Sequence, residues 1–294
     1  MQIRPRRSVL YMPGSNGRAL LKAKSIAADA LILDLEDAVA PEAKAMARGQ
    51  VCDAIKAGGY GRRELIVRIN ALDSPWGQAD LAAVAATAAD AILIPKVGSQ
   101  TDIAAVATGL ERAGASANIE LWAMIETPLA MLNLKEVASS SQALGARLGA
   151  LVLGSNDLVK ETRADLSSDR RPALYWLSAT VTAARAFGLD VLDGVYNDFK
   201  DADGFRRECL EGRALGFDGK TLIHPDQVAD ANGIFAPAEA EVMLARKIIA
   251  AFAQPENTGK GVITVEGRMV ELLHAKMAQR TVAIAEAIAA MGGQ

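Results

Sequence analysis

The sequence predicts a (β/α)8 TIM barrel followed by a C-terminal extension of helix and hairpin. Short, continuously apolar segments alternate with amphipathic or alanine-rich segments of helical length. This alternation is typical of a parallel sheet covered by helices on its outer face. It repeats eight times at spacings of roughly thirty residues, and eight such units indicate a closed barrel. The alternative, a doubly wound open sheet, would favour a glycine-rich dinucleotide turn after the first strand, and Pro13-Gly14-Ser15-Asn16-Gly17 does not match that fingerprint.

Local signals place each element in order. The first strand stops at Pro13-Gly14, and Ser15 or Asn16 can cap the helix that follows. The expected strands are residues 8–12, 30–33, 65–70, 91–96, 120–126, 150–154, 190–193 and 221–224. The expected helices pass through residues 22–28, 41–58, 78–89, 101–114 and 172–187, with a further helix ending at Gly216.

The repeat stops after His224. Residues 237–253 are expected to be helical, residues 254–261 form a polar linker, and residues 262–270 are expected to form a hairpin that turns at Glu266-Gly267. An alanine-rich helix follows. We therefore expect a barrel domain over residues 1–232 and an extension over residues 233–294.

Composition narrows the class of protein. The 294 residues are 51% hydrophobic and 23% charged, with a net charge of −3, so we expect no nucleic-acid surface. The apolar run Val9–Met12 is too short for a signal peptide or a membrane span. Cys52 and Cys209 lie far apart without paired spacing, which is typical of packing residues in a reduced, cytoplasmic protein.

Polar residues gather at the C-terminal ends of the expected strands, where TIM barrels place their active sites. They are Asp34, Glu36, Asp37, Arg68, Asn70, Lys96, Glu126, Asn156, Asp157, Asp193 and His224.

Glu126 and Asp157 end neighbouring strands, and two adjacent carboxylates repel each other unless a cation lies between them. Mg²⁺ takes such oxygen ligands and keeps positions for water and substrate, whereas no Cys/His cluster favours zinc. The other interpretation is that one of the two acids pairs with Arg68 or Lys96 and no metal binds. The residues alone leave both open.

Arg68 is a lone arginine in an apolar strand, and a buried charge needs a partner. That partner is either Asp34 or a substrate carboxylate held by two parallel hydrogen bonds. His224 is by itself more typical of a structural histidine than of a base. Lys22 and its basic neighbours form either a solvated face or a contact for a phosphorylated ligand.

Taken together, seven segments resemble the motif set of the citrate lyase β-subunit-like family, which includes malyl-CoA, methylmalyl-CoA and citramalyl-CoA lyases. They are Ser8–Ser15, Leu33–Val39, Val67–Asn70, Ile94–Lys96, Ile125–Thr127, Gly154–Leu158 and Ile223–Pro225. The resemblance spans essentially the whole chain, and within the family it is closest to malyl-CoA thioesterases, through residues 194–197, 217–225 and the segment around Glu271.

The resemblance implies a role for individual residues. Glu126 and Asp157 match magnesium ligands, for which Mn²⁺ is a possible substitute. Arg68 matches the arginine that holds the keto-acid carboxylate, and Asp34, Glu36 and Asp37 match acids that support Arg68 and the metal-bound waters. The positions that match contacts to CoA or the substrate pocket are Tyr11, Lys22, Asn156 and His224. Asn16 stands where malyl-CoA lyases often have an arginine, which Arg18 could replace.

The resemblance also implies that the extension reaches over the active site of the next subunit in a homotrimer or hexamer. The family has an aspartate in that tail, and Glu271 replaces it here. The implied activity is Mg²⁺-dependent carbon–carbon cleavage of a β-hydroxyacyl-CoA such as malyl-CoA to acetyl-CoA and a 2-keto acid. The alternatives are hydrolysis of the same thioester to malate and CoA, and a non-catalytic subunit that binds an acyl carrier.

Overall fold

The computed structural model describes residues 3–143, 147–166 and 169–292. Eight parallel strands form a closed barrel in sequence order, from β1 to β8, and β8 pairs with β1. This confirms the predicted fold class. The strands are β1 (Ser8–Pro13), β2 (Ala30–Asp34), β3 (Glu64–Arg68), β4 (Ala91–Ile94), β5 (Glu120–Ile125), β6 (Leu148–Leu153), β7 (Asp190–Asp193) and β8 (Gly219–Leu222).

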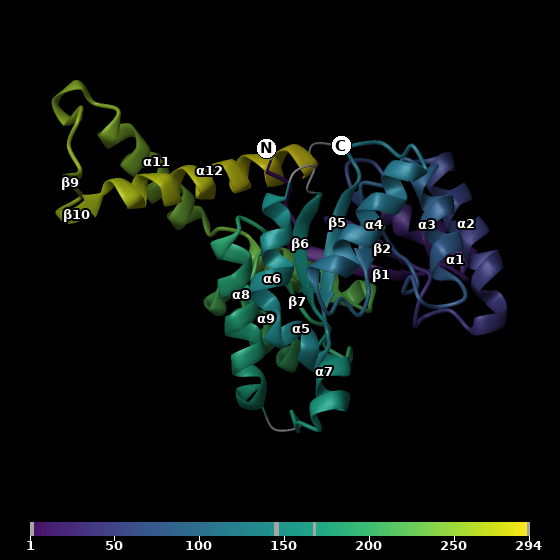
Figure 1. The fold of residues 1–294 in the computed structure, drawn as a ribbon. Helices are drawn as coiled ribbons and strands as arrows, with labels where there is room; N and C mark the ends of the chain where they lie inside the picture. The colour runs from purple at the N-terminus through teal and green to yellow at the C-terminus, as the bar shows by residue number, and fades with distance from the viewer. Residues whose placement is uncertain (1–2, 144–146, 167–168, 293–294) are drawn as a thin grey trace. The chain divides into compact units, whose positions relative to one another are not determined.

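Helices follow the strands and cover the outside of the barrel (Figure 1). They are α1 (Gly17–Lys22), α2 (Lys44–Ala57), α3 (Gly77–Ala85), α4 (Gln100–Arg112), α5 (Pro128–Leu132), α6 (Leu134–Ser139), α7 (Ser155–Thr162), α8 (Leu174–Ala186), α9 (Ala202–Leu215) and α10 (Val228–Phe235). The short helices α5, α6, α7 and α10 were not expected from the sequence. The first helix ends earlier than expected because Ile26 already has the extended backbone that leads into β2.

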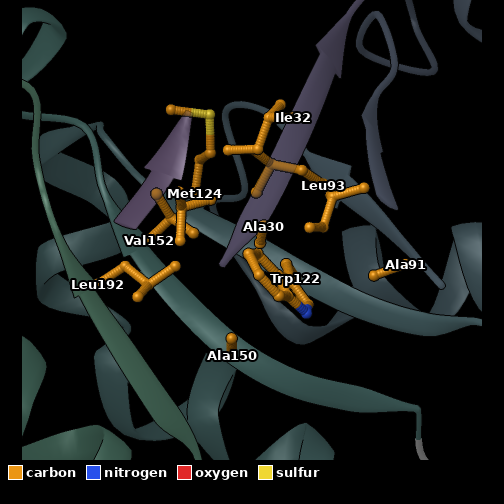
Figure 2. Packing of buried hydrophobic residues seen from close by; sticks show 11 residues of the cluster. Ala30, Ile32, Ala91, Leu93, Trp122, Met124, Ala150, Val152 and Leu192 are labelled. Atoms are coloured by element: carbon orange, nitrogen blue, oxygen red, sulfur yellow. The ribbon is translucent and has the colours of Figure 1, made fainter. Parts of the chain in front are cut away.

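The inside of the barrel is filled by alternate residues of successive strands. Ile32, Leu93, Met124, Val152 and Leu192 belong to one buried cluster that occupies the interior (Figure 2). Since side chains along a strand alternate between its two faces, this cluster fixes which residues of each strand point inward. The barrel is therefore a packed core, and the polar groups that continue its inward face can only lie above it.

A single arginine closes the N-terminal end of the barrel. Arg6 pairs with Glu64, Glu120 and Asp190, which are the first residues of β3, β5 and β7. Its guanidinium also lies 4.6 Å from the centre of the Trp122 ring. These acids hold the pKa of Arg6 above its usual value although burial opposes them, so this end of the barrel is sealed by charge pairs.

The chain divides into two compact units, one formed by Arg6–Asn232 and the other by Met1–Pro5 with Gly233–Gln294. The first unit is tied together at its ends, because the Ser8 hydroxyl bonds the Asn232 side chain at 2.7 Å and Asn232 also donates to the Ala27 carbonyl. The second unit contains α11 (Glu239–Phe252), β9 (Val262–Val265), β10 (Arg268–Glu271) and α12 (Leu272–Gly292).

In the second unit, β9 and β10 form an antiparallel hairpin whose turn is Glu266-Gly267, both with positive φ. The hairpin buries Ile263, Val265 and Val270 against one face of α11. Across the described parts of the chain, none of the helices combines the length and the apolar character needed to cross a membrane.

Candidate functional site

Strand alternation brings the predicted site residues onto one surface. Ile32, Ile66, Met124 and Val9 point into the barrel core, so the residues two positions later, Asp34, Arg68, Glu126 and Tyr11, continue that inward face at the C-terminal ends of the strands. Asp34, Arg68 and Glu126 are all buried. We name Asp34, Glu36, Asp37, Arg68, Lys96 and Glu126 the Arg68 cluster.

Arg68 is held mainly by Asp34. Its Nε and Nη2 atoms donate to the two Asp34 carboxylate oxygens at 2.7 and 2.6 Å. The remaining nitrogen, Nη1, lies 3.0 Å from Glu36 Oε2 and 3.6 Å from Asp37 Oδ2. The Tyr11 ring lies below the guanidinium, 4.9 Å from ring centre to Cζ. Asp34 is therefore the main structural partner, and Nη1 is the nitrogen at which a ligand carboxylate would compete with Glu36 and Asp37.

Glu36 is buried and is shared between two cations. Lys96 Nζ donates to Glu36 Oε1 at 2.7 Å, while Oε2 faces Arg68. Burial raises the pKa of Glu36, and Arg68 and Lys96 act in the opposite direction. The Asp37 side chain is 60% exposed, so it can leave Arg68 without burying an unpaired charge.

Glu126 lies in a tightly limited space. Its Oε1 accepts a 2.6 Å hydrogen bond from the Lys96 backbone N–H. A Cβ atom on Gly154 would lie 2.4 Å from the Glu126 Cβ and 2.9 Å from Oε2, so only glycine fits at this point of the neighbouring strand. Burial, together with the charges of Glu36 and Asp157, raises the pKa of the Glu126 carboxyl to about 7, although the Lys96 N–H and Arg68 act in the opposite direction.

Asp157 lies in the first turn of α7, directly after β6, and is partly exposed. The charge of Asp157 contributes to the raised pKa of Glu126, which indicates that the two carboxylates repel each other. The ammonium and guanidinium groups of Lys96 and Arg68 pair with other acids of the cluster, so neither of them neutralises this pair.

The donor set fits magnesium. The described residues contain no group of three or more His, Cys, Asp or Glu side chains arranged to hold a metal, but Mg²⁺ is commonly held by one or two carboxylates together with water and substrate oxygens. Glu126 and Asp157 supply those carboxylates, and a cation beside them would remove the repulsion that now raises the pKa of Glu126.

Asn156 and His224 belong to a second group of side chains around the loop after β7. The Asn156 and Asn197 amides exchange two hydrogen bonds, of 2.8 and 3.2 Å. The His224 ring stacks on Phe199 with 4.6 Å between ring centres, and its Nδ1 accepts from the Asp226 N–H. Gln227 links the two loops by donating to the Tyr196 carbonyl.

Lys22 and Glu271 belong to elements that contain none of the Arg68 cluster residues. Lys22 is exposed in the last turn of α1. Glu271 ends β10 in the second unit, where its N–H donates to His274 Nδ1 at 3.0 Å. Asn16 caps α1 through its side chain.

A second buried charge cluster lies on the other face of the sheet. Lys220 in β8 is fully buried and pairs with Asp193 at the end of β7 and with Glu208 of α9. Arg170 also pairs with both acids. We name Arg170, Asp193, Glu208 and Lys220 the Lys220 cluster. Asp193 was expected at a strand end, whereas Lys220 was given no role; the signal for Lys220 is a lysine inside a short apolar strand.

Comparisons with known proteins agree with this arrangement. Residues 7–225 match the model of the HpcH/HpaI aldolase/citrate lyase family. A (3S)-malyl-CoA thioesterase of Cereibacter sphaeroides is 50% identical over 99% of this chain and 98% of its own length. An L-malyl-CoA/beta-methylmalyl-CoA lyase of the same species is 37% identical over 98% of this chain and 96% of its own length.

Among solved structures, the CitE protein of Mycobacterium tuberculosis in complex with magnesium, acetoacetate and coenzyme A superposes with a TM-score of 0.72. It is 28% identical, and the match covers 94% of this chain and 97% of that one. The relatives are enzymes that act on acyl thioesters or related acids. The chain is therefore an enzyme, and it belongs to the HpcH/HpaI aldolase/citrate lyase family.

Proposed function

We propose that this enzyme hydrolyses the thioester of malyl-CoA, or of a closely related β-hydroxyacyl-CoA, to the free hydroxy acid and CoA. The observation that carries the proposal is the presence of Arg68, whose Nη1 is shared with Glu36, close to the repelling carboxylates Glu126 and Asp157. A ligand with a carboxylate and a neighbouring hydroxyl matches this combination. The higher identity to thioesterases than to lyases favours hydrolysis over the carbon–carbon cleavage expected first.

Glu126 and Asp157 are the proposed magnesium ligands, and Mn²⁺ would suit the same oxygen donors. When bound, the metal supplies a Lewis acid for the hydroxyl and carboxylate oxygens of the malyl group. The chain's own contribution is placement: Lys96 and Gly154 hold the Glu126 carboxylate where it is.

Arg68 is proposed to bind the malyl carboxylate through Nη1, displacing Asp37. Asp34 keeps the guanidinium plane fixed by its two hydrogen bonds, and Tyr11 supports the plane from below. In this proposal Tyr11 acts at the acyl end of the substrate. Lys22 is proposed to contact the CoA moiety from the surface of α1, and Asn156 and His224 to border the substrate pocket.

The hydrolytic step needs a base for water. Water oxygen bonds to the thioester carbon, the carbon–sulfur bond breaks, and the sulfur leaves as a thiolate that takes up a proton. Glu271 is proposed to accept the water proton first and to return it to the sulfur. The extension over residues 233–294 is proposed to cover the site of a neighbouring subunit in a homotrimer or hexamer. The exposed apolar side chains beside Glu271, which are Met269, Leu272, Leu273 and Met277, support an interface there.

The test is mass analysis of the products formed from malyl-CoA and Mg²⁺. Malate with free CoA is the expected result. If the products are acetyl-CoA and glyoxylate, the enzyme is a lyase and not a thioesterase. Lyase activity is the second candidate, and the 37% identical relative favours it. No turnover of malyl-CoA by the magnesium-loaded enzyme would overturn both.

A further inference from the structure

Lys96 contacts Glu126 through its backbone N–H and Glu36 through its side-chain ammonium. We propose that it is a positioning residue: its backbone N–H fixes Glu126 so that the other carboxylate oxygen faces the metal, and its ammonium shares Glu36 with Arg68 so that an incoming carboxylate can compete for Nη1. This inference deepens the proposed function and rests on it for the identity of the ligand.

The backbone of Lys96 has an unusual conformation. Its φ is 53°, in the left-handed region that residues other than glycine, asparagine and aspartate rarely adopt. Among the described residues, the other non-glycine positions with positive φ are Arg163, which ends α7, and Glu266, in the hairpin turn. Lys96 ends no helix and turns no hairpin. Strain of this kind gathers at functional sites, where surrounding contacts must hold it.

The contact that accompanies the strained backbone is the Lys96 N–H bond to Glu126 Oε1, at 2.6 Å. Gly154 approaches the same carboxyl from the neighbouring strand, close to Oε2. Because Oε1 already accepts the Lys96 N–H, Oε2 is the oxygen that a metal would meet without competing with that bond. The backbone of Lys96 would therefore direct Glu126 to present Oε2 to Mg²⁺.

The ammonium of Lys96 acts on the other side of the site. Glu36 Oε1 accepts from it at 2.7 Å. Glu36 Oε2 is buried and lies 3.0 Å from Arg68 Nη1, but no described group donates a hydrogen bond to it. Because Lys96 shares this carboxylate, it weakens the hold of Glu36 on Nη1; without Lys96, the negative charge of Glu36 would act on Arg68 alone. The Arg68 cluster already has four acids against two cations, so losing the ammonium would also increase repulsion of an incoming carboxylate.

Two variants of similar size separate the backbone from the side chain. Lys96→Asn and Lys96→Val both remove the ammonium, but only asparagine tolerates a left-handed backbone. Calorimetric titration of Mg²⁺ into the full-length protein without substrate is the measurement. We expect Lys96→Val to bind Mg²⁺ roughly 10–100-fold more weakly than wild type, as is typical when a metal ligand loses its supporting hydrogen bond. Lys96→Asn should lose less than about tenfold.

Equal Mg²⁺ affinity in the two variants would overturn the backbone part of the proposal. If Lys96→Val does not fold, as judged by circular dichroism, Lys96→Ala and Lys96→Gly replace the first pair of variants. The glycine variant is then expected to bind Mg²⁺ more tightly than the alanine variant.

The side-chain part is tested with malate as the ligand, at saturating Mg²⁺. Lys96→Asn should weaken malate binding by about tenfold or more, the size expected for losing a charged hydrogen bond, and Lys96→Arg should retain most of it. In a Glu36→Gln background, replacing Lys96 should have little further effect, because the ammonium acts through Glu36. This part would be overturned if Lys96→Asn bound malate as tightly as wild type. It would also be overturned if Lys96→Asn weakened malate binding as much in the Glu36→Gln background as in the wild-type background. These binding measurements do not depend on which products malyl-CoA gives, so the proposed function and this proposal can fail separately.

Discussion

The Lys220 cluster and the Arg68 cluster lie on opposite faces of the same sheet, and they differ in how their charges balance. In the Lys220 cluster two acids face two cations, and the ion pairs hold the pKa of Asp193 below its usual value despite burial. In the Arg68 cluster the acids outnumber the cations, and the pKa values of Glu36 and Glu126 are raised.

The difference in charge balance distinguishes a structural cluster from one that is suited to bind a ligand. A balanced cluster needs nothing further, and its groups stabilise one another. In the other cluster burial raises the pKa values of Glu36 and Glu126 by more than Arg68 and Lys96 lower them, and a bound cation would favour their charged forms. The inward face of the barrel is therefore the face prepared for a ligand, while the outward cluster joins β7 and β8 to α9.

The largest expected effect is on turnover. Glu126→Gln should lower kcat/KM for malyl-CoA by about a thousandfold, or about 4 kcal/mol, because it removes a metal ligand. Steady-state assays of thiol release at varied Mg²⁺ measure this. Glu120→Gln, at the other end of β5 in the Arg6 network, is the matched control and should retain turnover. A Glu126→Gln enzyme with wild-type efficiency would show that the acid-rich cluster needs no cation.

Asp193→Asn should lower the free energy of unfolding by about 3 kcal/mol at pH 7, since it leaves Lys220 buried with less compensation. Because the folded-state pKa of Asp193 is lowered, its contribution is complete above the unfolded value of 3.8 and is lost as the pH falls below it. The difference between variant and wild type in urea unfolding should therefore shrink at acid pH. The exposed Asp203→Asn should change stability by less than about 0.5 kcal/mol. A difference that grows at low pH would reverse the assignment of Asp193.

Arg68→Lys keeps the charge but loses the planar pair of donors. We expect a loss of about 2–3 kcal/mol of transition-state binding, seen in kcat/KM. Arg170→Lys makes the same change in the balanced cluster and should lower stability while leaving kcat/KM nearly unchanged. If the two variants behave alike, both arginines are structural, and the distinction between the clusters fails.

The smallest expected change in stability comes from Glu271, which belongs to neither cluster. Glu271→Ala should leave folding and Mg²⁺ binding intact but remove most turnover. Glu271→Asp, shorter by roughly 1.5 Å, should shift products from malate toward acetyl-CoA and glyoxylate, since displacements of about 1 Å already affect rates strongly. Glu266→Ala, in the hairpin turn, serves as the control. Wild-type rates and products in both Glu271 variants would make Glu271 an ordinary surface residue of the extension.

Much of the fold could be predicted because apolar strands and helix-start signals are local. The positions of β4, β5 and β7 follow directly from their apolar runs. Strand β8 was expected at 221–224 but lies at Gly219–Leu222. The charged Lys220 interrupts the apolar run, so the pattern did not indicate that the strand begins before it. The short α5, α6 and α7 were not expected, since they contain too few turns to show a periodic pattern.

The site was only partly predictable, for a related reason. Strand ends identify Asp34, Arg68 and Glu126, because a parallel barrel brings those ends together. Lys96 was expected only as a strand-end residue and as a possible partner of Glu126 or Asp157, because its contacts depend on a left-handed backbone and on Glu36 and Glu126, which are distant in sequence. The pairing of Asn156 with Asn197 likewise depends on how two loops meet.

The bonds made by Asn232 have a consequence for how the chain can be divided and rearranged. This residue fastens the end of the barrel unit to Ser8 and Ala27, close to where that unit begins. The beginning and end of the barrel are therefore neighbours, held by the barrel's own side chains. Such a unit is suited to circular permutation, with a short linker joining its natural ends and new termini opened in a surface loop.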